Sequence, residues 1–225
     1  MTAIATGRRQ INLTFHGIGE PPGELTPGED AVWISVDRFE AILDQVRDHR
    51  DVNLTFDDGN ISDIRYALPE LKRRGLAATF FVVAGRLGQA NYLAEQDVRA
   101  LVAAGMQVGC HGMEHRGWRG LTDEHLRDEL QAARAILEKT AGHPVTSAAC
   151  PFGLYDRRVL RALREYGYKR VFTSDDGIAK SASWLQARNT ITKGTAANTL
   201  DYVLAQEKLI PRTIRTAKGA AKRWR

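Results

Sequence analysis

Short apolar runs alternate with longer amphipathic stretches along most of the chain. Seven runs rich in β-branched and aromatic residues have the length of buried strands. Most stretches between them repeat apolar residues three and four positions apart, as one face of a helix does. The stretch Val36–His49 presents Phe39, Ile42, Leu43 and Val46 at this spacing. The predicted strands are Ile11–Phe15, Val52–Phe56, Ala77–Val83, Met106–Cys110, Thr146–Cys150, Arg170–Thr173 and Leu185–Ile191.

Capping residues indicate where the other predicted helices begin and end. Thr122 is a favourable N-cap, and two acidic residues follow it where the helix dipole favours negative charge, so a helix is predicted over Thr122–Thr140. A glycine directly follows each of three further predicted helices, as is common at helix C-termini. These helices are Ile64–Arg74, Gln96–Ala104 and Asp156–Tyr166.

Strands separated by helices predict an α/β fold with parallel βα units, either a barrel or an open doubly wound sheet. In both architectures the carboxyl ends of the strands converge on one face, where active sites lie. The first connection, His16–Trp33, holds three prolines and four glycines and is predicted to be an irregular loop.

Adjacent carboxylates, Asp57 and Asp58, end the run Thr55-Phe56-Asp57-Asp58-Gly59 after a predicted strand. Two carboxylates packed this closely need a cation or a proton to compensate them. Taken alone, the run is equally typical of an acidic turn, because Asp-Gly favours turns.

Two histidines four residues apart, His111 and His115, follow another predicted strand. At this spacing both imidazoles can bind one metal ion. Together with Asp58 they predict a site with three protein ligands and an open position, the pattern of catalytic rather than structural metal sites. Asp57, which lies beside the ligand, is then available as a general base towards water.

The combination of Thr55–Gly59 with His111–His115 resembles the polysaccharide deacetylases, carbohydrate esterase family 4 with its NodB-homology domain. The resemblance covers residues 10–195. It implies a distorted (β/α) barrel, usually of seven strands, that removes N-acetyl groups from amino sugars with a divalent metal ion. It implies zinc most often, with cobalt, nickel or manganese as substitutes. By this resemblance Asp57 matches the base, and Asp58, His111 and His115 match the metal ligands.

The third motif of that family aligns with Ala149–Gly153, where Ala149 replaces the arginine that steadies the base. The resemblance assigns Pro151, Phe152 and Gly153 to the substrate groove, with the Phe152 N–H as an oxyanion donor, a kind of group worth about 3 kcal/mol. The residues alone are also typical of a turn before a helix.

The fourth motif falls at Ser174-Asp175-Asp176-Gly177, and its aspartate normally pairs with the missing arginine. Arg188, on the last predicted strand, is a candidate to supply that positive charge, although a solvated arginine explains its presence as well.

The histidine that serves as general acid in the fifth motif is absent, since no histidine follows His143. His16 ends the first predicted strand and is therefore expected on the same face as the other motifs. We assign it to the catalytic group, as the donor of a proton to the leaving amine, with Asp57 as the alternative donor. A loop-capping role for His16 stays open.

Other readings of these residues differ in the reaction or in the scaffold. His111-x-x-Glu114-His115 also matches a metalloprotease motif that requires a helix, but the surrounding glycines disfavour one. Non-haem iron oxygenases share the two-histidine, one-carboxylate set, but the alternating βα pattern disfavours their usual scaffold. An allantoinase-like amidohydrolase acting on a non-sugar C–N bond, or a catalytically impaired glycan-binding descendant, stays open.

Charge is distributed unevenly along the 225 residues, which carry a net charge of +5. Seven basic and no acidic residues follow position 207, so we divide the chain into a slightly acidic barrel domain, 1–207, and a basic tail, 208–225. The tail repeats apolar residues at helical spacing, which suits either contact with an anionic membrane surface or a helix packed on the barrel. Nucleic acid is not an expected partner, because no binding motif accompanies the charge.

The composition also bears on location. No stretch approaches the roughly 18 apolar residues of a membrane span. The two cysteines allow at most one disulfide, and the first residues do not resemble a secretory signal. We therefore expect reduced thiols and a cytoplasmic location, with contact at the inner face of the membrane if the tail binds lipid.

Overall fold

The computed structural model describes residues 7–203, apart from positions 24, 26, 27, 196, 197, 200 and 202. The predicted tail, 208–225, lies outside the described residues. Within them, no helix is long and apolar enough to cross a membrane.

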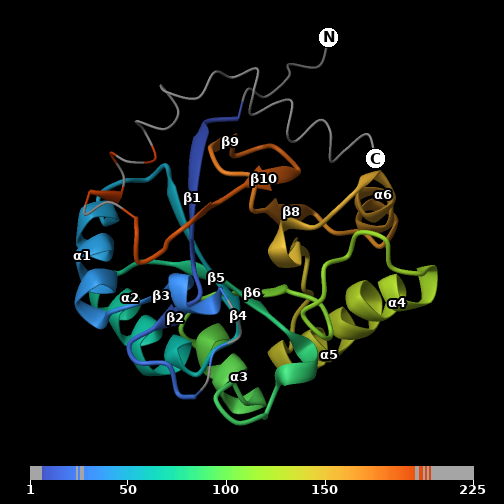
Figure 1. The fold of residues 1–225 in the computed structure, drawn as a ribbon, viewed down its shortest axis with the longest axis horizontal. Helices are drawn as coiled ribbons and strands as arrows, with labels where there is room; N and C mark the ends of the chain where they lie inside the picture. The colour runs from blue at the N-terminus through green and yellow to red at the C-terminus, as the bar shows by residue number, and fades with distance from the viewer. Residues whose placement is uncertain are drawn as a thin grey trace.

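A mostly parallel sheet runs through the described chain and curves into a nearly closed barrel (Figure 1). Its hydrogen-bonded order is β10-β8-β7-β6-β5-β4-β1-β11. The distorted (β/α) barrel expected from the sequence is confirmed, with the parallel strands close to their predicted positions. These strands are β1 (Arg9–Phe15), β4 (Val52–Asp58), β5 (Ala78–Val82), β6 (Gln107–Cys110), β7 (Ser147–Ala149), β8 (Arg170–Thr173), β10 (Leu185–Ala187) and β11 (Asn189–Thr190).

The last predicted strand, Leu185–Ile191, closes the barrel by pairing with both ends of the sheet. Its first half, β10, pairs in parallel with β8, and its second half, β11, pairs in parallel with β1. Arg188 is the residue between the two halves. The short strand β9 (Ile178–Lys180) pairs antiparallel with the beginning of β1. One segment therefore holds the first and last βα units together.

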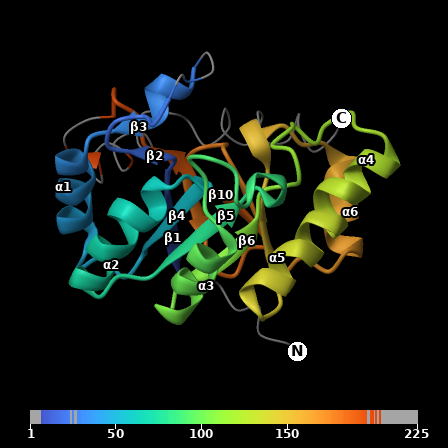
Figure 2. The same cartoon turned by 90° about the horizontal axis from the view of Figure 1, so that it is seen from below.

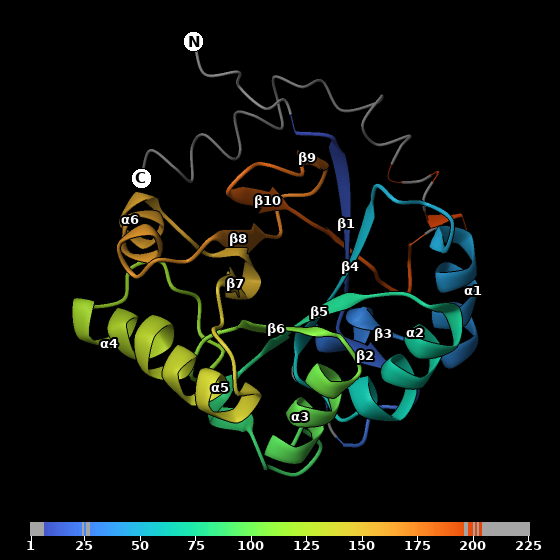
Figure 3. The same cartoon turned by 180° about the vertical axis from the view of Figure 1, so that it is seen from behind.

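Helices surround the outside of the sheet, as Figure 1 and the opposite view in Figure 3 show. The long predicted helices are interrupted: a π-helical turn, η2, precedes α2, and a second, η4, separates α4 from α5. The helices are α1 (Val36–Val46), η2 (Asp63–Ala67), α2 (Leu68–Arg74), α3 (Glu95–Ala103), α4 (Asp123–Arg127), η4 (Asp128–Ala132), α5 (Ala133–Ala141) and α6 (Arg157–Glu165).

The apolar core lies between the sheet and these helices. Along β1 and β4 every second residue faces it, so Phe15 and Phe56 stack with ring centroids 5.1 Å apart. Phe80 of β5 extends the stack, and Phe39 of α1 packs edge-on against Phe15. All four side chains are fully buried, which fixes the register of these neighbouring strands.

The alternate residues of the same strands face the barrel interior and are polar. Asn53 donates to Asn12, whose own amide donates to Gln186 of the closing segment. Thr14 and Thr55 are hydrogen-bonded across β1 and β4 at 3.0 Å. These buried polar groups are thus paired with one another, as burial in a barrel requires.

The loop after β1 is more regular than its prolines and glycines predict. β2 (Gly17–Ile18) pairs in parallel with β3 (Trp33–Ile34), and a short 3₁₀ helix, η1 (Glu29–Val32), precedes β3. A Cβ on Gly17 would lie 2.0 Å from the Trp33 ring, so this contact requires glycine. The prediction of an irregular loop was wrong here, because a two-residue strand is too short to leave a periodic pattern. The β2–β3 pair lies at one end of the barrel (Figure 2).

Candidate active site

A cavity of about 340 Å³ opens at the carboxyl end of the barrel strands. Its walls come from the end of β4 and from the segments that follow β1, β6, β7 and β8, so residues distant in sequence meet there. The lining residues include His16, Asp57, Asp58, His111, His115, Phe152, Ser174 and Thr190.

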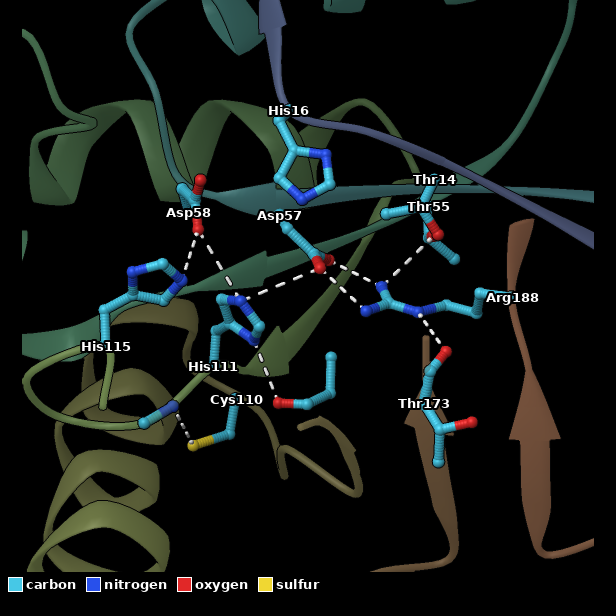
Figure 4. Close-up of polar contacts among 12 residues, drawn as sticks. Thr14, His16, Thr55, Asp57, Asp58, Cys110, His111, His115, Thr173 and Arg188 are labelled. Carbon is cyan, nitrogen blue, oxygen red and sulfur yellow. Dashed lines mark hydrogen bonds and ion pairs between the residues drawn. The ribbon is translucent and has the colours of Figure 1, made fainter. Parts of the chain in front are cut away.

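Asp57 and Arg188 form a bidentate ion pair at the base of this cavity (Figure 4). Arg188 Nη1 donates to Asp57 Oδ1 at 2.6 Å, and Nη2 donates to Oδ2 at 2.7 Å. Arg188 Nε donates to the Thr173 carbonyl at 3.3 Å, and its side chain is 1% exposed. The guanidinium also lies over the Phe81 ring, 5.3 Å from its centroid. Arg188 is therefore held in one orientation by strands on both sides of it.

The pairing sets the charge of Asp57. Burial alone would raise the pKa of this carboxyl, but the Arg188 guanidinium and, less strongly, His111 hold the pKa below its usual value. Asp57 is therefore ionised across the neutral pH range. From the sequence we expected Arg188 to pair with the fourth-motif aspartate, but in the structure it pairs with Asp57.

Asp58 faces the two histidines instead of the helices outside the sheet. Its backbone has φ of 76°, in the left-handed region that non-glycine residues seldom adopt, and this turns the chain out of strand geometry. Asp58 Oδ1 lies 3.0 Å from His115 Nε2 and 3.5 Å from His111 Nε2. Burial would raise the pKa of Asp58, but the contact with His115 and the nearby His16 and His111 hold it well below its usual value.

His111 is prepared to act as a ligand. Its Nδ1 lies 2.9 Å from the Ala149 carbonyl, which can only accept, so Nδ1 carries the proton and the Nε2 lone pair faces the carboxylates. Burial lowers the pKa of His111 to about 4, against the opposing effect of Asp57. The imidazole is thus neutral near pH 7, as metal ligation requires.

His115 has a different second partner. Its Nδ1 lies 3.4 Å from Arg86 Nη2, and a guanidinium only donates, so in this tautomer Nε2 carries the proton facing Asp58. Ligation through Nε2 requires the other neutral tautomer, in which Nδ1 carries the proton and no longer accepts from Arg86. His115 itself has φ of 54°, a second positive value at the site.

The residues present fit a divalent metal ion. One ligand atom from each of Asp58, His111 and His115 lies within 4.8 Å of the others. The donor set of two imidazoles and one carboxylate is typical of catalytic zinc sites. The Asp58 oxygen that faces both imidazoles and the preset His111 tautomer are the features that suit a cation.

The structure places the remaining predicted residues around this centre. His16 lines the cavity beside Asp57 and Asp58, and its Nδ1 is buried without a hydrogen-bond partner among the described residues. Phe152, within the turn Pro151–Gly153, is 64% exposed, and its ring centroid lies 4.6 Å from that of His115.

The two fourth-motif aspartates are farther from the cation site. Asp175 accepts a hydrogen bond from the Tyr155 hydroxyl at 2.5 Å. The Asp176 backbone N–H donates to the Arg188 carbonyl at 3.2 Å, so this loop supports the closing segment. Their side chains do not line the cavity that holds Asp57.

Two buried carboxylates near the site were not anticipated from the sequence. Asp63, in η2, is fully buried, and burial together with Asp58 and Asp57 raises its pKa well above the usual value. Glu129, in η4, contacts the loop that carries His111 and His115. The sequence contained one signal for Glu129: it is an acidic residue on the otherwise apolar helix face formed by Leu126, Leu130 and Ala133.

Comparison with known proteins gives one family. The family model described as polysaccharide deacetylase matches residues 44–171. YxkH of Bacillus subtilis, which is named for this family, is 25% identical over 167 residues, 74% of this chain and 57% of the relative. A peptidoglycan-N-acetylglucosamine deacetylase of Bacillus cereus is 28% identical over 55% of this chain and 56% of the relative. The chain thus spans little more than half the length of these relatives.

Solved structures agree with the fold. A Streptococcus pyogenes deacetylase in complex with acetate superposes with a TM-score of 0.77 at 22% identity, over 88% of this chain and 99% of that one. A polysaccharide deacetylase from Bacillus cereus also gives 0.77, at 21% identity, over 88% of this chain and 69% of that one. At these identities the likeness concerns the fold alone.

Replacement of Arg188 by methionine is expected to lower the free energy of unfolding by about 3–5 kcal/mol at neutral pH, because it leaves Asp57 buried and unpaired. Urea denaturation followed by circular dichroism measures this loss. In acid, the difference in the free energy of unfolding between wild type and the variant becomes smaller. In the absence of Arg188, burial raises the pKa of Asp57 above its value in the unfolded chain, so protonation removes the buried charge.

The matched control is Arg158→Met, whose ion pair with Asp123 joins side chains 40% and 86% exposed. Its loss should stay below about 1 kcal/mol. The double variant Arg188→Met with Asp57→Asn should recover part of the stability. Equal stability of the Arg188 and Arg158 variants would contradict the assignment.

Proposed function

Because this chain belongs to the polysaccharide deacetylase family, we propose that it is a metal-dependent hydrolase that removes the acetyl group from an N-acetylated amino sugar. The substrate would be a glycan or its lipid- or nucleotide-linked precursor. The observation that carries this proposal is the convergence of Asp58, His111 and His115 beside an ionised Asp57 in one open cavity. The names of the relatives, which include deacetylases of peptidoglycan and other polysaccharides, point to the same substrate class.

Asp58, His111 and His115 would hold the metal ion, zinc in the first instance, with cobalt, nickel or manganese as alternatives. When bound, such an ion supplies a Lewis acid to the amide carbonyl and to water. The protein contributes the preset donor atoms, and the cavity leaves space for the acetamide next to them.

Asp57 would take the proton from the attacking water. Its lowered pKa keeps it ionised, so it is ready as a base at neutral pH, although a weakly basic one. A weak base suffices where the acidity of the water has itself been increased. Arg188 holds both carboxylate oxygens in place and so orients the base.

Phe152 and His16 would act on the acetamide and on the leaving amine. The Phe152 N–H is assigned to the developing oxyanion, and the turn that holds it forms one wall of the cavity. His16, whose Nδ1 has no other partner among the described residues, would donate a proton to the amine. The protonated Asp57 is the second candidate donor for this step.

The alternatives receive less support. An impaired descendant that only binds glycans would not need a base, yet Asp57 is retained together with a replacement for the missing arginine. Hydrolysis of a non-sugar amide would use the same residues, but the relatives named for a substrate act on glycans. A cytoplasmic location and a membrane contact through the tail stay predictions.

The decisive experiment measures acetate release from N-acetylglucosamine oligomers, peptidoglycan fragments and lipid-linked sugars by the zinc-loaded protein. We expect release from at least one substrate, its loss after chelation, and its return when the metal is restored, because the water and carbonyl depend on the ion. Absence of acetate from every substrate, with zinc bound, would refute the proposal.

Asp57→Asn is expected to reduce the rate of acetate release by about 10²- to 10⁴-fold, since it removes the general base. Metal affinity, measured by competition with a chromophoric chelator, should change little because Asp57 is not a ligand. The paired variant Asp58→Asn should instead lose metal. If Asp57→Asn lost metal and Asp58→Asn retained it, the roles assigned to the two residues would be exchanged.

His16→Gln tests the proton donor. We expect kcat to fall by about 10²-fold with little change in KM, because proton donation contributes in the transition state. His125→Gln, on the exposed side of α4, is the control. An unchanged kcat in the His16 variant would assign the donor role to Asp57.

A further inference from the structure

Glu129 is buried beneath the segment Gly112–Trp118, which we call the histidine loop because it links His111 to His115 and continues past it. Its residue exposure is 2%, although the acidic residues of α4, Asp123 and Glu124, are exposed. It belongs to the π-helical turn η4 between α4 and α5. Such turns shift the facing of a helix by one residue and are often found at functional sites.

Three N–H groups of the histidine loop converge on the Glu129 carboxylate. Oε2 accepts from the Met113 backbone at 2.9 Å and from the Trp118 indole at 3.3 Å. Oε1 accepts from the Glu114 backbone at 3.1 Å. Both oxygens are therefore used, and each holds a different part of the loop.

The opposite side of the same peptides is held by the segment after β5. The Ala84 N–H donates to the Gly112 carbonyl at 2.9 Å, and the Gly85 N–H donates to the Met113 carbonyl at 3.0 Å. The peptide between Gly112 and Met113 is thus fixed through its oxygen and its nitrogen. Two independent elements clamp the backbone that runs from one histidine to the other.

The fit around Glu129 leaves no room for a side chain at Gly112. A Cβ on Gly112 would lie 2.1 Å from Glu129 Oε2, and its φ of 87° is itself favourable only for glycine. Glycine is therefore required at position 112, where the loop passes over the buried Glu129 carboxylate. Beyond Glu114 the loop reaches His115 in its left-handed conformation.

We propose that Glu129 is a positioning residue for the metal site: by binding the backbone of the histidine loop it holds His115 at the distance from His111 and Asp58 that ligation needs. This inference rests on the proposed metal site but concerns residues that touch neither metal nor substrate. The carboxylate is needed because both oxygens accept hydrogen bonds. An amide at this position would turn an N–H group towards one of the loop donors.

The test is Glu129→Gln, with Glu138→Gln as its matched control. Glu138 lies farther along the same helical segment, in α5, and its Oε1 also accepts a backbone N–H, that of Val145, in a loop away from the site. Both variants change one carboxylate that accepts a backbone N–H into an amide. The measurements are Zn²⁺ and Co²⁺ affinity by chelator competition, the visible spectrum of bound Co²⁺, and amide hydrogen exchange of the metal-free protein.

We expect Glu129→Gln to weaken metal affinity by about 10- to 100-fold, as loss of an outer partner of a metal site does. Its Co²⁺ spectrum should change, and exchange should accelerate at the Met113 and Glu114 amides but not at His111, whose N–H donates to the Val82 carbonyl. Glu138→Gln should leave all three measurements unchanged. Wild-type affinity and exchange in Glu129→Gln would overturn the inference.

Two further outcomes separate this inference from the proposed function. If the wild-type protein binds neither ion, the proposed metal site is wrong. If, in addition, Glu129→Gln does not accelerate exchange at the Met113 and Glu114 amides, the positioning of the loop by Glu129 is wrong as well. If Glu129→Gln does not fold, Trp118→Phe takes its place, because it removes one donor to Glu129 while retaining an aromatic ring. Metal affinity should then fall less, and equality with wild type would count against the inference.

Discussion

The buried ion pair between Asp57 and Arg188 is the interaction on which both the barrel and its site depend. Two charges removed from water are costly unless each is satisfied by short, well-directed bonds. Here the guanidinium satisfies both Asp57 oxygens and reaches a carbonyl of β8. Because Arg188 lies where the closing segment passes from β8 to β1, the pair can form only when the barrel is closed. Closure of the fold therefore also orients Asp57, the proposed base.

The same pair gives Asp57 a charged partner although Ala149 stands where the resemblance implies an arginine. The position expected to carry an arginine holds Ala149, which packs with Phe81 and Phe172 in a small apolar cluster. The Arg188 guanidinium lies over the Phe81 ring, having reached the carboxylate from another strand. The buried Asp57 carboxylate needs a cationic partner, and more than one strand can supply it. The site is in this respect defined by geometry rather than by position in the sequence.

Local pattern in the sequence was enough to predict part of the site. Strand ends follow from apolar periodicity, and parallel strands bring their carboxyl ends together, so Asp58, His111 and His115 could be grouped from the amino-acid sequence alone. The partner of Arg188 could not be predicted, because it depends on how the closing segment divides between two neighbours. Glu129 lies on the buried helix face that Leu126, Leu130 and Ala133 define, but the backbone groups that its carboxylate accepts belong to a loop whose path the sequence does not show.

Backbone conformation determines the different orientations of the two adjacent aspartates, Asp57 and Asp58. In a regular strand successive side chains point to opposite faces, so Asp57 in the barrel interior would place Asp58 among the helices. The positive φ of Asp58 prevents this and turns its carboxylate towards the histidines. Such a conformation is unfavourable for a non-glycine residue and persists only where the surroundings fix it. Gly59, with its own φ of 70°, and the ladder between β4 and β5 supply that constraint. The strained backbone therefore allows one strand end to present Asp57, the proposed base, beside Asp58, a proposed metal ligand.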